Sequence, residues 1–417
     1  MREMKDSRIG WVGQVPNTWG VIRGKYLFSN NKQVVGARVD QYERLALTLN
    51  GVIKRSKEDN EGLQPDKFDT YQILRENELV FKLIDLQNVS TSRVGYSKYT
   101  GIVSPAYIVL KANKNMNPRF AEKYYLMMWM NEVFNALGDS GVRSSLNAKE
   151  LLELCVLVPS LQEQQKIADY LDRKCGEIDS VMADLQEQID KLEQYKRSVI
   201  SETVTKGLNP KGPMKDSGIG WIDMIPNSWK VDRISSLYRL RNTKVNDRDY
   251  PPLSVTMKGI LPQLETAAKT NAHEDRKLVR IGDFAINSRS DRRGSCGVSQ
   301  YDGSVSLINT VLQPLSNMIP GYYNWLFHTV EFADEFYKWG HGIVNDLWTT
   351  GWQEMKNIKI IIPSLQEQQK IADYLDKKCA EIESIIADKK HQLEVVENYK
   401  KSLIYEYVTG KKEVSDE

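Results

Sequence analysis

Apolar residues recur at alternating steps of three and four along two long stretches of the chain, which begin after Pro159 and after Pro363. This spacing is a heptad repeat, whose apolar seam faces a partner helix in a coiled coil. Each stretch opens with the S-x-x-E pattern of a capping box, which predicts a helix N-terminus there. The seam consists of Leu171, Cys175, Ile178, Met182, Leu185, Ile189 and Leu192 in the first stretch, and of Leu375, Cys379, Ile382, Ile386, Leu393, Val396 and Leu403 in the second.

The first stretch predicts one helix over 161–205, which ends before the helix breakers of GLNPKGP. Such a helix is about 65 Å long at 1.5 Å per residue, and it cannot bury its own seam. The second stretch is the obvious partner. Because a whole domain separates the two helices, they can return antiparallel, which would relate the domains by a pseudo-twofold axis. Two other arrangements stay open here: each helix could pack on its own domain or on a second chain.

The segments that precede the two helices show an α+β pattern. Short β-like runs alternate with turn residues, and each segment has one aromatic-rich helical stretch that follows a proline, 118–137 and 320–339. Their aromatic residues are expected in the core. The expected strands are 45–49, 78–83, 106–110 and 154–158 in the first segment, and 253–257, 283–287, 309–313 and 358–362 in the second.

The chain repeats itself. PSLQEQQKIADYLD occupies 159–172 and recurs unchanged at 363–376, and MKDSRIGWVGQVPNTW from Met4 is matched by MKDSGIGWIDMIPNSW from Met214. A nearly constant offset over the whole length indicates a tandem duplication of a domain with its connector. The predicted parts are a first variable domain over 1–158, a first connector helix over 159–208, a second variable domain over 209–362 and a second connector helix over 363–417.

Composition excludes several classes of protein. Apolar residues make up 41% and charged residues 27% of the 417 residues, as in a globular protein. The apolar runs are strand-sized, and the start of the chain does not resemble a signal peptide, so we expect neither a membrane span nor secretion. The four cysteines form no CxxC pair, which predicts no metal site or disulfide framework and favours the reduced cytoplasm.

The net charge of +2 gives no argument for nucleic acid, so such an argument must come from local clusters. The densest cluster is SRSDRRG, with three arginines in five residues beside Ser and Gly. Arginine can neutralise phosphate and can also bind guanine O6 and N7 through two hydrogen bonds. For any single basic residue, a solvated surface position is the alternative. The candidate DNA-binding residues are Lys54, Arg55, Arg93, Lys98, Arg143, Arg241, Lys258, Arg289, Arg292 and Arg293.

Polar residues at the start of both connector helices are identical between the copies. A solvated helix face is one explanation. The other is a pair of equal docking sites for two copies of a partner, at Gln164 and Gln165 in the first copy and at Gln368 and Gln369 in the second.

Catalytic motifs are absent from the sequence. There is no GxxxxGK[ST] phosphate loop, no NPP[YF] tetrapeptide of an amine methyltransferase, and no cluster of the four histidines. A duplicated enzyme should carry its catalytic residues in both halves. Glu78 and Asp283 do align, but they stand where a turn enters a strand, and the nuclease-like spacing of Glu78 and Lys82 is missing from the second copy. We therefore expect no catalytic residues and no cofactor in this chain.

The paired PSLQEQQKIADYLD segments, each followed by a heptad helix, and the paired IGW…P-N-x-W openings resemble the specificity subunit of type I restriction–modification enzymes over nearly the whole chain. The resemblance implies that each variable domain is a target-recognition domain reading one half of an interrupted double-stranded DNA site. It implies that the helices form an antiparallel spacer. It further implies docking of two methylation subunits, which use S-adenosylmethionine to methylate adenine, and of restriction subunits that cut unmodified DNA.

Two alternatives compete with this reading. A coiled-coil scaffold with two protein-binding domains would need no DNA, and the arginine-rich loop argues against it. A single-chain restriction–methylation enzyme should contain a methyltransferase or nuclease motif, and none is present. A specificity subunit used for methylation alone would have the same sequence features as one that serves a full restriction system.

Overall fold

The computed structural model describes residues 2–59, 67–84, 86, 93–137, 145–209, 211–263, 273–342 and 348–415. The chain divides into two compact units. Unit 1 comprises 1–186 and 391–417, and unit 2 comprises 187–390. Each unit therefore contains one variable domain together with a part of both long helices, α4 (Leu161–Lys206) and α8 (Leu365–Val408). Among the described residues, no helix combines the length and the apolar character needed to cross a membrane.

The predicted capping residues begin both long helices. The hydroxyl of Ser160 accepts the backbone N–H of Glu163 at 3.2 Å, and that of Ser364 accepts the N–H of Glu367 at 3.3 Å. These bonds satisfy N–H groups that have no partner within the helix. At the other end of α4, Gly207 has a φ of +73°, the left-handed conformation that ends a helix and favours glycine. The helix limits could therefore be predicted from local chemistry alone.

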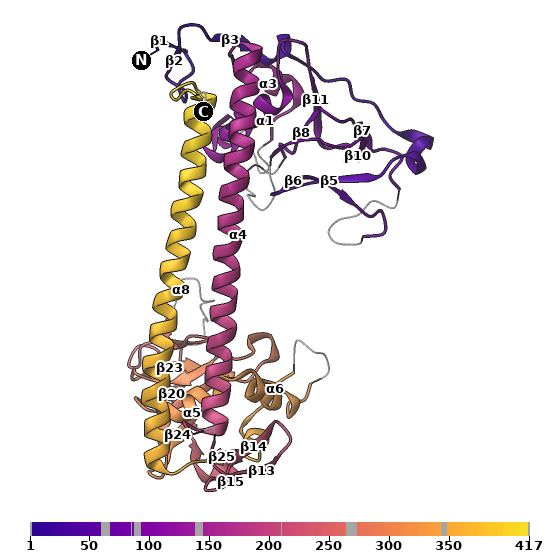
Figure 1. The fold of residues 1–417 in the computed structure, drawn as a ribbon. Helices are drawn as coiled ribbons and strands as arrows, with labels where there is room; N and C mark the ends of the chain where they lie inside the picture. The colour runs from indigo at the N-terminus through magenta and orange to yellow at the C-terminus, as the bar shows by residue number, and fades with distance from the viewer. Residues whose placement is uncertain are drawn as a thin grey trace. The chain divides into compact units, whose positions relative to one another are not determined.

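The two long helices pack antiparallel within each unit (Figure 1). In unit 1 the hydroxyls of Tyr170 and Tyr407 lie 3.2 Å apart, and Asp179 pairs with Lys400 at 2.5 Å. In unit 2, Glu193 pairs with Lys390 at 3.7 Å, and Lys196 pairs with Glu383. As the number rises along α4 it falls along α8, which confirms the predicted antiparallel pair.

The seam residues are buried or half-buried, and they serve two kinds of core. Ile189, Ile382 and Ile386 form a cluster of helix residues only, with Leu192 against it. Nearer the helix ends, the seam merges with the cores of the variable domains. Leu171, Ile178 and Leu403 belong to the core of unit 1, with Met182 and Val396 packed against it, and Leu375 belongs to the core of unit 2. Leu185 is buried and Leu393 is half-buried.

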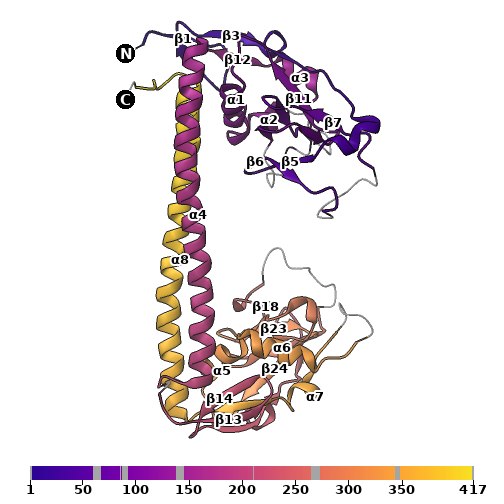
Figure 2. The ribbon, with the colours of Figure 1, turned by 45° about the vertical axis from the view of Figure 1, so that its right-hand side comes forward.

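The variable domain of unit 1 has small sheets with helices packed on them (Figure 2). Strand β3 (Gly20–Arg23) pairs with β12 (Cys155–Val158), which leads directly into α4. One sheet has the order β6 (Gly51–Arg55), β5 (Arg44–Thr48), β10 (Gly101–Val103), β7 (Gln72–Leu74). The other sheet has the order β4 (Phe28–Ser29), β11 (Ile108–Ala112), β8 (Leu79–Phe81), β9 (Val94–Tyr96). The remaining elements are β1 (Met4–Asp6), β2 (Gln14–Pro16), α1 (Pro118–Met130), α2 (Val133–Leu137), α3 (Ala148–Glu153), η1 (Gly24–Tyr26) and η2 (Gly36–Gln41).

The variable domain of unit 2 repeats this plan. Strand β15 (Lys230–Arg233) pairs with β25 (Lys359–Ile362), and the main sheet has the order β16 (Tyr238–Leu240), β24 (Asn309–Pro314), β21 (Phe284–Asn287), β22 (Cys296–Val298). The same strand order in the equivalent places shows one fold used twice. The other elements are β13 (Met214–Ile219), β14 (Ile222–Pro226), β17 (Lys244–Val245), β18 (Leu253–Thr256), β19 (Gly259–Pro262), β20 (Arg276–Val279), β23 (Gly303–Ser306), α5 (Pro320–Phe327), α6 (Val330–Lys338), α7 (Trp352–Met355), η3 (Ile234–Ser236) and η4 (Ser290–Arg292).

Each aromatic-rich stretch that was expected as one helix is two. In unit 1 the break follows α1, where Glu132 has a φ of +56°, which ends the regular helix. In unit 2 it lies between α5 and α6, where the hydroxyl of Thr329 caps the second helix by accepting the N–H of Phe332 at 3.2 Å. The aromatic side chains are in the core as expected: Tyr124, Phe134, Phe332 and Phe336 are fully buried.

Candidate nucleic-acid interface

The arginine-rich segment of unit 2 is a pinned loop between β21 and β22. Its two ends are joined by a hydrogen bond from the N–H of Asn287 to the carbonyl of Ser295 at 2.9 Å. The hydroxyl of Tyr337, on α6, donates to the carbonyl of Asn287 at 3.1 Å, and burial raises the pKa of this phenol, so it stays a donor. The N–H of Ser290 donates to the carbonyl of Trp348 at 3.0 Å. The loop backbone is thus fixed from both sides.

This loop presents its three arginines with different degrees of support. The side chains of Arg289, Arg292 and Arg293 are 37%, 69% and 54% exposed. Asp291 lies between the first two, with its carboxylate oxygens 3.4 Å from Arg289 Nε and 3.9 Å from Arg292 Nε. Arg293 is instead held by an ion pair with Asp334 of α6, and it lies over the ring of Tyr337 at 5.8 Å. All three can therefore reach a ligand, and within the described part of the chain only Arg293 has its side chain held by a second element.

Three other candidate residues are exposed. Lys258 lies in the turn between β18 and β19, and Lys98 follows β9. Lys54 on β6 pairs with Glu43 at 2.6 Å and lies 5.3 Å from the centre of the Tyr99 ring. The ammonium of Lys54 is a point charge that binds without a fixed plane, so it can exchange Glu43 for phosphate. Arg55 is half-buried and bound to Asp59 at 2.6 Å.

Two of the predicted DNA-binding arginines are internal instead. Arg241 binds Asp283 through two hydrogen bonds of 2.5 and 3.0 Å, and the Asp283 side chain is only 2% exposed. A buried carboxylate needs such a counter-charge, which occupies the guanidinium. Arg93 is 1% exposed and donates to the carbonyl of Ile84 at 3.1 Å. Each of these arginines has its guanidinium engaged inside its own domain, Arg93 in unit 1 and Arg241 in unit 2, and Arg143 lies outside the described residues.

The aligned acids Glu78 and Asp283 close equivalent turns. The carboxylate of Glu78 accepts the N–H of Arg75 at 2.8 Å, and that of Asp283 accepts the N–H of Arg280 at 2.9 Å. This agrees with the expectation that they stand where a turn enters a strand. Their equivalence is a matter of folding, and it explains why both halves keep an acid there.

Gln164 and Gln368 also have an internal role, which corrects their expected exposure to a partner. Gln164 is 0% and Gln368 is 1% exposed. The side-chain oxygen of Gln164 accepts the N–H of Asn117 at 2.7 Å, and that of Gln368 accepts the N–H of Ile319 at 2.8 Å. Their amides donate to the carbonyls of Pro159 and Pro363, respectively, at 3.0 and 2.8 Å. Each glutamine ties a connector helix to its own variable domain, so neither presents its amide to a partner.

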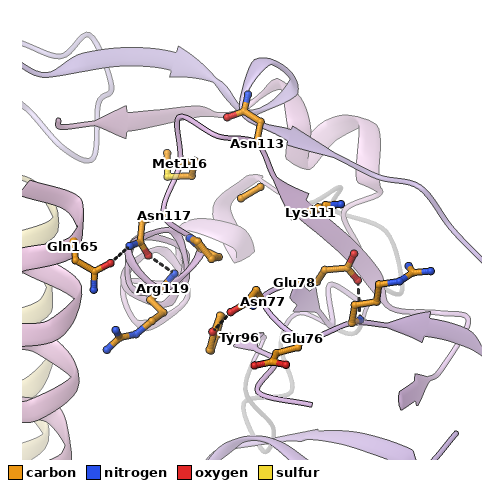
Figure 3. A pocket seen from close by; sticks show the side chains of 13 residues that line it. Glu76, Asn77, Glu78, Tyr96, Lys111, Asn113, Met116, Asn117, Arg119 and Gln165 are labelled. Carbon is orange, nitrogen blue, oxygen red and sulfur yellow. Dashed lines mark hydrogen bonds between the residues drawn. The ribbon is translucent and has the colours of Figure 1, made fainter. Parts of the chain in front are cut away.

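Gln165 and Gln369, in contrast, are exposed and remain candidates for docking. Gln165 lies at the rim of an open polar pocket of about 460 Å³ at the start of α1 (Figure 3). Its oxygen accepts from the amide of Asn117 at 2.7 Å, while Arg119 in the same pocket reaches Asp169 at 2.7 Å and also pairs with Asp172. The polar groups of this pocket thus fasten the first variable domain to α4. Gln369 donates to Asp373 at 2.8 Å on α8.

Sequence reasoning missed the acids and the tyrosine that support the arginine-rich loop. Asp291 was visible inside SRSDRRG, but Asp334 and Tyr337 lie more than forty residues further along the chain. Their positions at i and i+3 on α6 place them on one helix face. In the described part of the chain, no group of histidine, cysteine and acidic residues is arranged to hold a metal ion.

Known proteins are similar to this chain over most of its length. A family model described as the type I restriction modification DNA specificity domain matches residues 1–191 and 254–395. The type I restriction enzyme MjaX specificity subunit of Methanocaldococcus jannaschii is 22% identical over 433 residues, which is 96% of this chain and 95% of the relative. A type I specificity subunit of Mycoplasma pneumoniae is 28% identical over 277 residues, which is 64% of this chain and 66% of the relative.

A solved structure is similar along its whole length. It comes from a study of complex assembly and conformational transition of the type I R-M system. The likeness has a TM-score of 0.71 at 13% identity and covers 95% of this chain and 99% of the other. At this level of identity the likeness concerns the fold.

Proposed function

The chain belongs to the family of type I restriction–modification DNA specificity domains, and we propose that it reads the two halves of an interrupted DNA site, one with each variable domain. The observation that carries this proposal is the duplication of one fold, with the same strand order in the main sheet of both units but different exposed side chains. Two readers with a common frame and separate surfaces suit two different half-sites. The alternative of a scaffold without DNA binding is not favoured, because the family is one of DNA specificity domains.

Base recognition in the second half-site is assigned to the pinned loop with Arg289, Arg292 and Arg293. Guanidinium groups suit both phosphate and the O6 and N7 acceptors of guanine. The exposed lysines Lys54, Lys98 and Lys258 suit phosphate, which they can neutralise without fixed geometry.

The chemistry of modification is assigned to partner subunits. The relatives are specificity subunits, and we propose that two methylation subunits dock on this chain and bring S-adenosylmethionine for adenine methylation. Restriction subunits would join them to cut unmodified DNA. Because the substrate is chromosomal and invading DNA, the complex is placed in the cytoplasm.

Docking of two equal partners finds support in a duplicated apolar flank of the helices. Val181 and Tyr399 in unit 1, and Tyr195 and Ile385 in unit 2, are between 46% and 57% exposed. Val181 and Ile385 are equivalent in the repeat, as are Tyr195 and Tyr399, and all four occupy the same heptad position. The ion pair Asp179–Lys400 places Val181 and Tyr399 at the same height along the two helices. The ion pair Lys196–Glu383 does the same for Tyr195 and Ile385. Each unit thus offers the same apolar couple, with Gln165 or Gln369 further along the helix.

Domain exchange with methylome sequencing tests the function. The chain is co-expressed with the methylation subunit encoded beside it, and the methylated sites of the host genome are sequenced. Residues 15–158 are then replaced by the first domain of another family member, and residues 209–362 by a second domain in a matched variant. Each exchange should change only its own half of the methylated sequence. A change in both halves, or methylation by this chain without its partner, would refute the proposal.

A further inference from the structure

The charges of the arginine-rich loop do not suit a surface that only holds phosphate. Its three arginines are accompanied by two carboxylates, those of Asp291 and Asp334, which reduce the local formal charge to about +1. A carboxylate at a DNA surface repels the backbone, and it cancels the counterion release that an arginine would provide. Two acids in this position weaken binding to every sequence alike. Their presence therefore has to be explained by something other than affinity for the backbone.

Orientation of one arginine gives that explanation. Asp334 contacts the Nη2 of Arg293, and Tyr337, one turn further along the same helix, lies under the guanidinium at 5.8 Å from its ring centre. A guanidinium has five N–H donors, so a carboxylate that takes one N–H of Nη2 leaves the other N–H of Nη2, together with that of Nη1 or Nε beside it, for a base edge. The hydroxyl of Tyr337 also fixes the loop through the carbonyl of Asn287. The side chain of Arg293 and the loop backbone at Asn287 and Arg292 are thus held by the same helix.

Among the described residues, the side chain of the neighbouring Arg292 has no comparable contact with α6. Its side chain is 69% exposed, and its ionic contact with Asp291 is long, at 3.9 Å. A loosely held guanidinium adapts to phosphate oxygens but loses more rotational freedom when it forms two parallel bonds to a base. The two adjacent arginines therefore suit different ligands on the DNA.

We propose that Arg293 reads a guanine of the second half-site and that Asp334 is the positioning residue that determines this specificity, whereas Arg292 binds phosphate. The proposal rests on the function proposed above, because it requires the loop to face DNA. Asp334 acts through Arg293: it restricts the guanidinium to one plane before DNA arrives, so less order is lost when the guanine is bound. Its cost in general affinity is the repulsion of the backbone.

Base-by-base binding measurements test the proposal. The target of the wild-type complex is first determined from its methylated genomic sites. Duplexes with that target, with each single substitution in the second half-site, and with no target are then titrated against the full complex at several salt concentrations. The variants are Arg293→Ala, Asp334→Ala, Asp334→Glu, the double variant Arg293→Ala/Asp334→Ala, and Arg292→Ala. Glu331→Gln is the matched control, since it removes a charge from the same face of α6, one turn before Asp334.

Arg293→Ala should reduce discrimination at one G·C pair by about 5- to 150-fold, the value of a two-bond guanine contact. Asp334→Ala should relax the same pair, while binding to DNA without the target stays equal or becomes stronger. The double variant should be no less selective than Arg293→Ala, and Asp334→Glu should restore part of the discrimination. Arg292→Ala should weaken all duplexes alike and flatten the salt dependence. Glu331→Gln should behave as the wild type.

Two failures are distinguishable. If Arg293→Ala relaxes one pair but Asp334→Ala discriminates as the wild type does, or weakens all duplexes equally, the positioning role is wrong and the loop still reads DNA. If the arginine variants change neither affinity nor target, the loop does not face DNA, and its assignment in the proposed function is wrong as well.

Discussion

Substitution of Gln164 by alanine should destabilise unit 1 strongly, although the residue is polar and lies at the start of a helix. The side chain is 0% exposed, and it makes three hydrogen bonds, to the N–H of Asn117 at 2.7 Å and to the carbonyls of Pro159 at 3.0 Å and Asn115 at 3.2 Å. Alanine leaves these backbone groups without their partner. At a net value of about 1 kcal/mol for each bond, the loss is about 3 kcal/mol.

Calorimetry of the full chain measures this loss. For a unit of roughly 200 residues, 1 kcal/mol shifts Tm by about 2–4 °C, so the transition of unit 1 should fall by about 6–12 °C. Gln368→Ala, which removes bonds to Ile319 and Pro363, should lower the transition of unit 2 by about 4–8 °C. The matched control is Gln165→Ala, one residue away but exposed, with a shift under about 2 °C.

A Tm of Gln164→Ala within about 2 °C of the wild type would contradict this structural role of Gln164. The hydrogen bonds of Gln164 would then add no net stability. Contact with a partner subunit would become the explanation for a glutamine at this position in both copies. The opposite pattern, with a large shift for Gln165→Ala only, would likewise reverse the two roles. Binding of the methylation subunit, measured well below the lower Tm, separates the effects: Gln164→Ala should still bind it.

Three further predictions follow from other contacts. Arg241→Ala should cost about 3–5 kcal/mol of stability by leaving the buried Asp283 without a counter-charge, while the recognised sequence stays the same; an altered base preference in methylome data would contradict this internal role. Burial raises the pKa of Asp172, but Lys123 and Arg119 outweigh it and hold this pKa below the ordinary 3.8. The ionised Asp172 therefore stabilises the fold above about pH 4, and this stabilisation is lost as the pH falls through the lower pKa of the folded state. The wild type should exceed Asp172→Asn in unfolding free energy by about 2 kcal/mol at neutral pH, and this difference should shrink below pH 4. A difference that grows below pH 4 would contradict the assignment. An insertion of four residues within 184–190 adds about 6 Å to α4. It should lengthen the unread gap of the DNA site by about two base pairs and leave both half-site sequences unchanged. An active variant with the original gap would show that the helices do not set the spacing.

The fold was most predictable where its determinants are local. Both limits of α4 and the start of α8 follow from Ser160, Gly207 and Ser364, and the pairing of the two helices follows from a heptad seam that one helix cannot bury. The break after α1 was not predicted, because the residue in the left-handed conformation is Glu132 and not a glycine, which would have indicated a helix end in the sequence. Pairing between distant strands had no local signal either. The parallel contact of β10 with β5 in unit 1 joins residues 44 and 102, which no periodicity links.

The residues of the candidate site show the same difference between local and tertiary determinants. The exposure of Arg289, Arg292 and Arg293 could be predicted from the sequence, because Ser and Gly beside them indicate a loop; their contact with DNA stays a prediction. Arg241 could not be separated from them, because its burial depends on Asp283, 42 residues further along the chain. A basic side chain can bind DNA only when it is not paired with a buried carboxylate, and such pairing depends on the tertiary structure.

Identity between the two copies has two possible causes, and the structure separates them residue by residue. Gln164 and Gln368 are identical because each holds its own variable domain, as do the tryptophan–glutamate pairs Trp19–Glu163 and Trp229–Glu367. Once such positions are set aside, the shared residues that stay exposed have no internal cause for their apolar character. Tyr195 and Tyr399 are of this kind, at 51% and 57% exposure. An exposed apolar residue of this kind, present in both copies, is the basis of the docking proposed above.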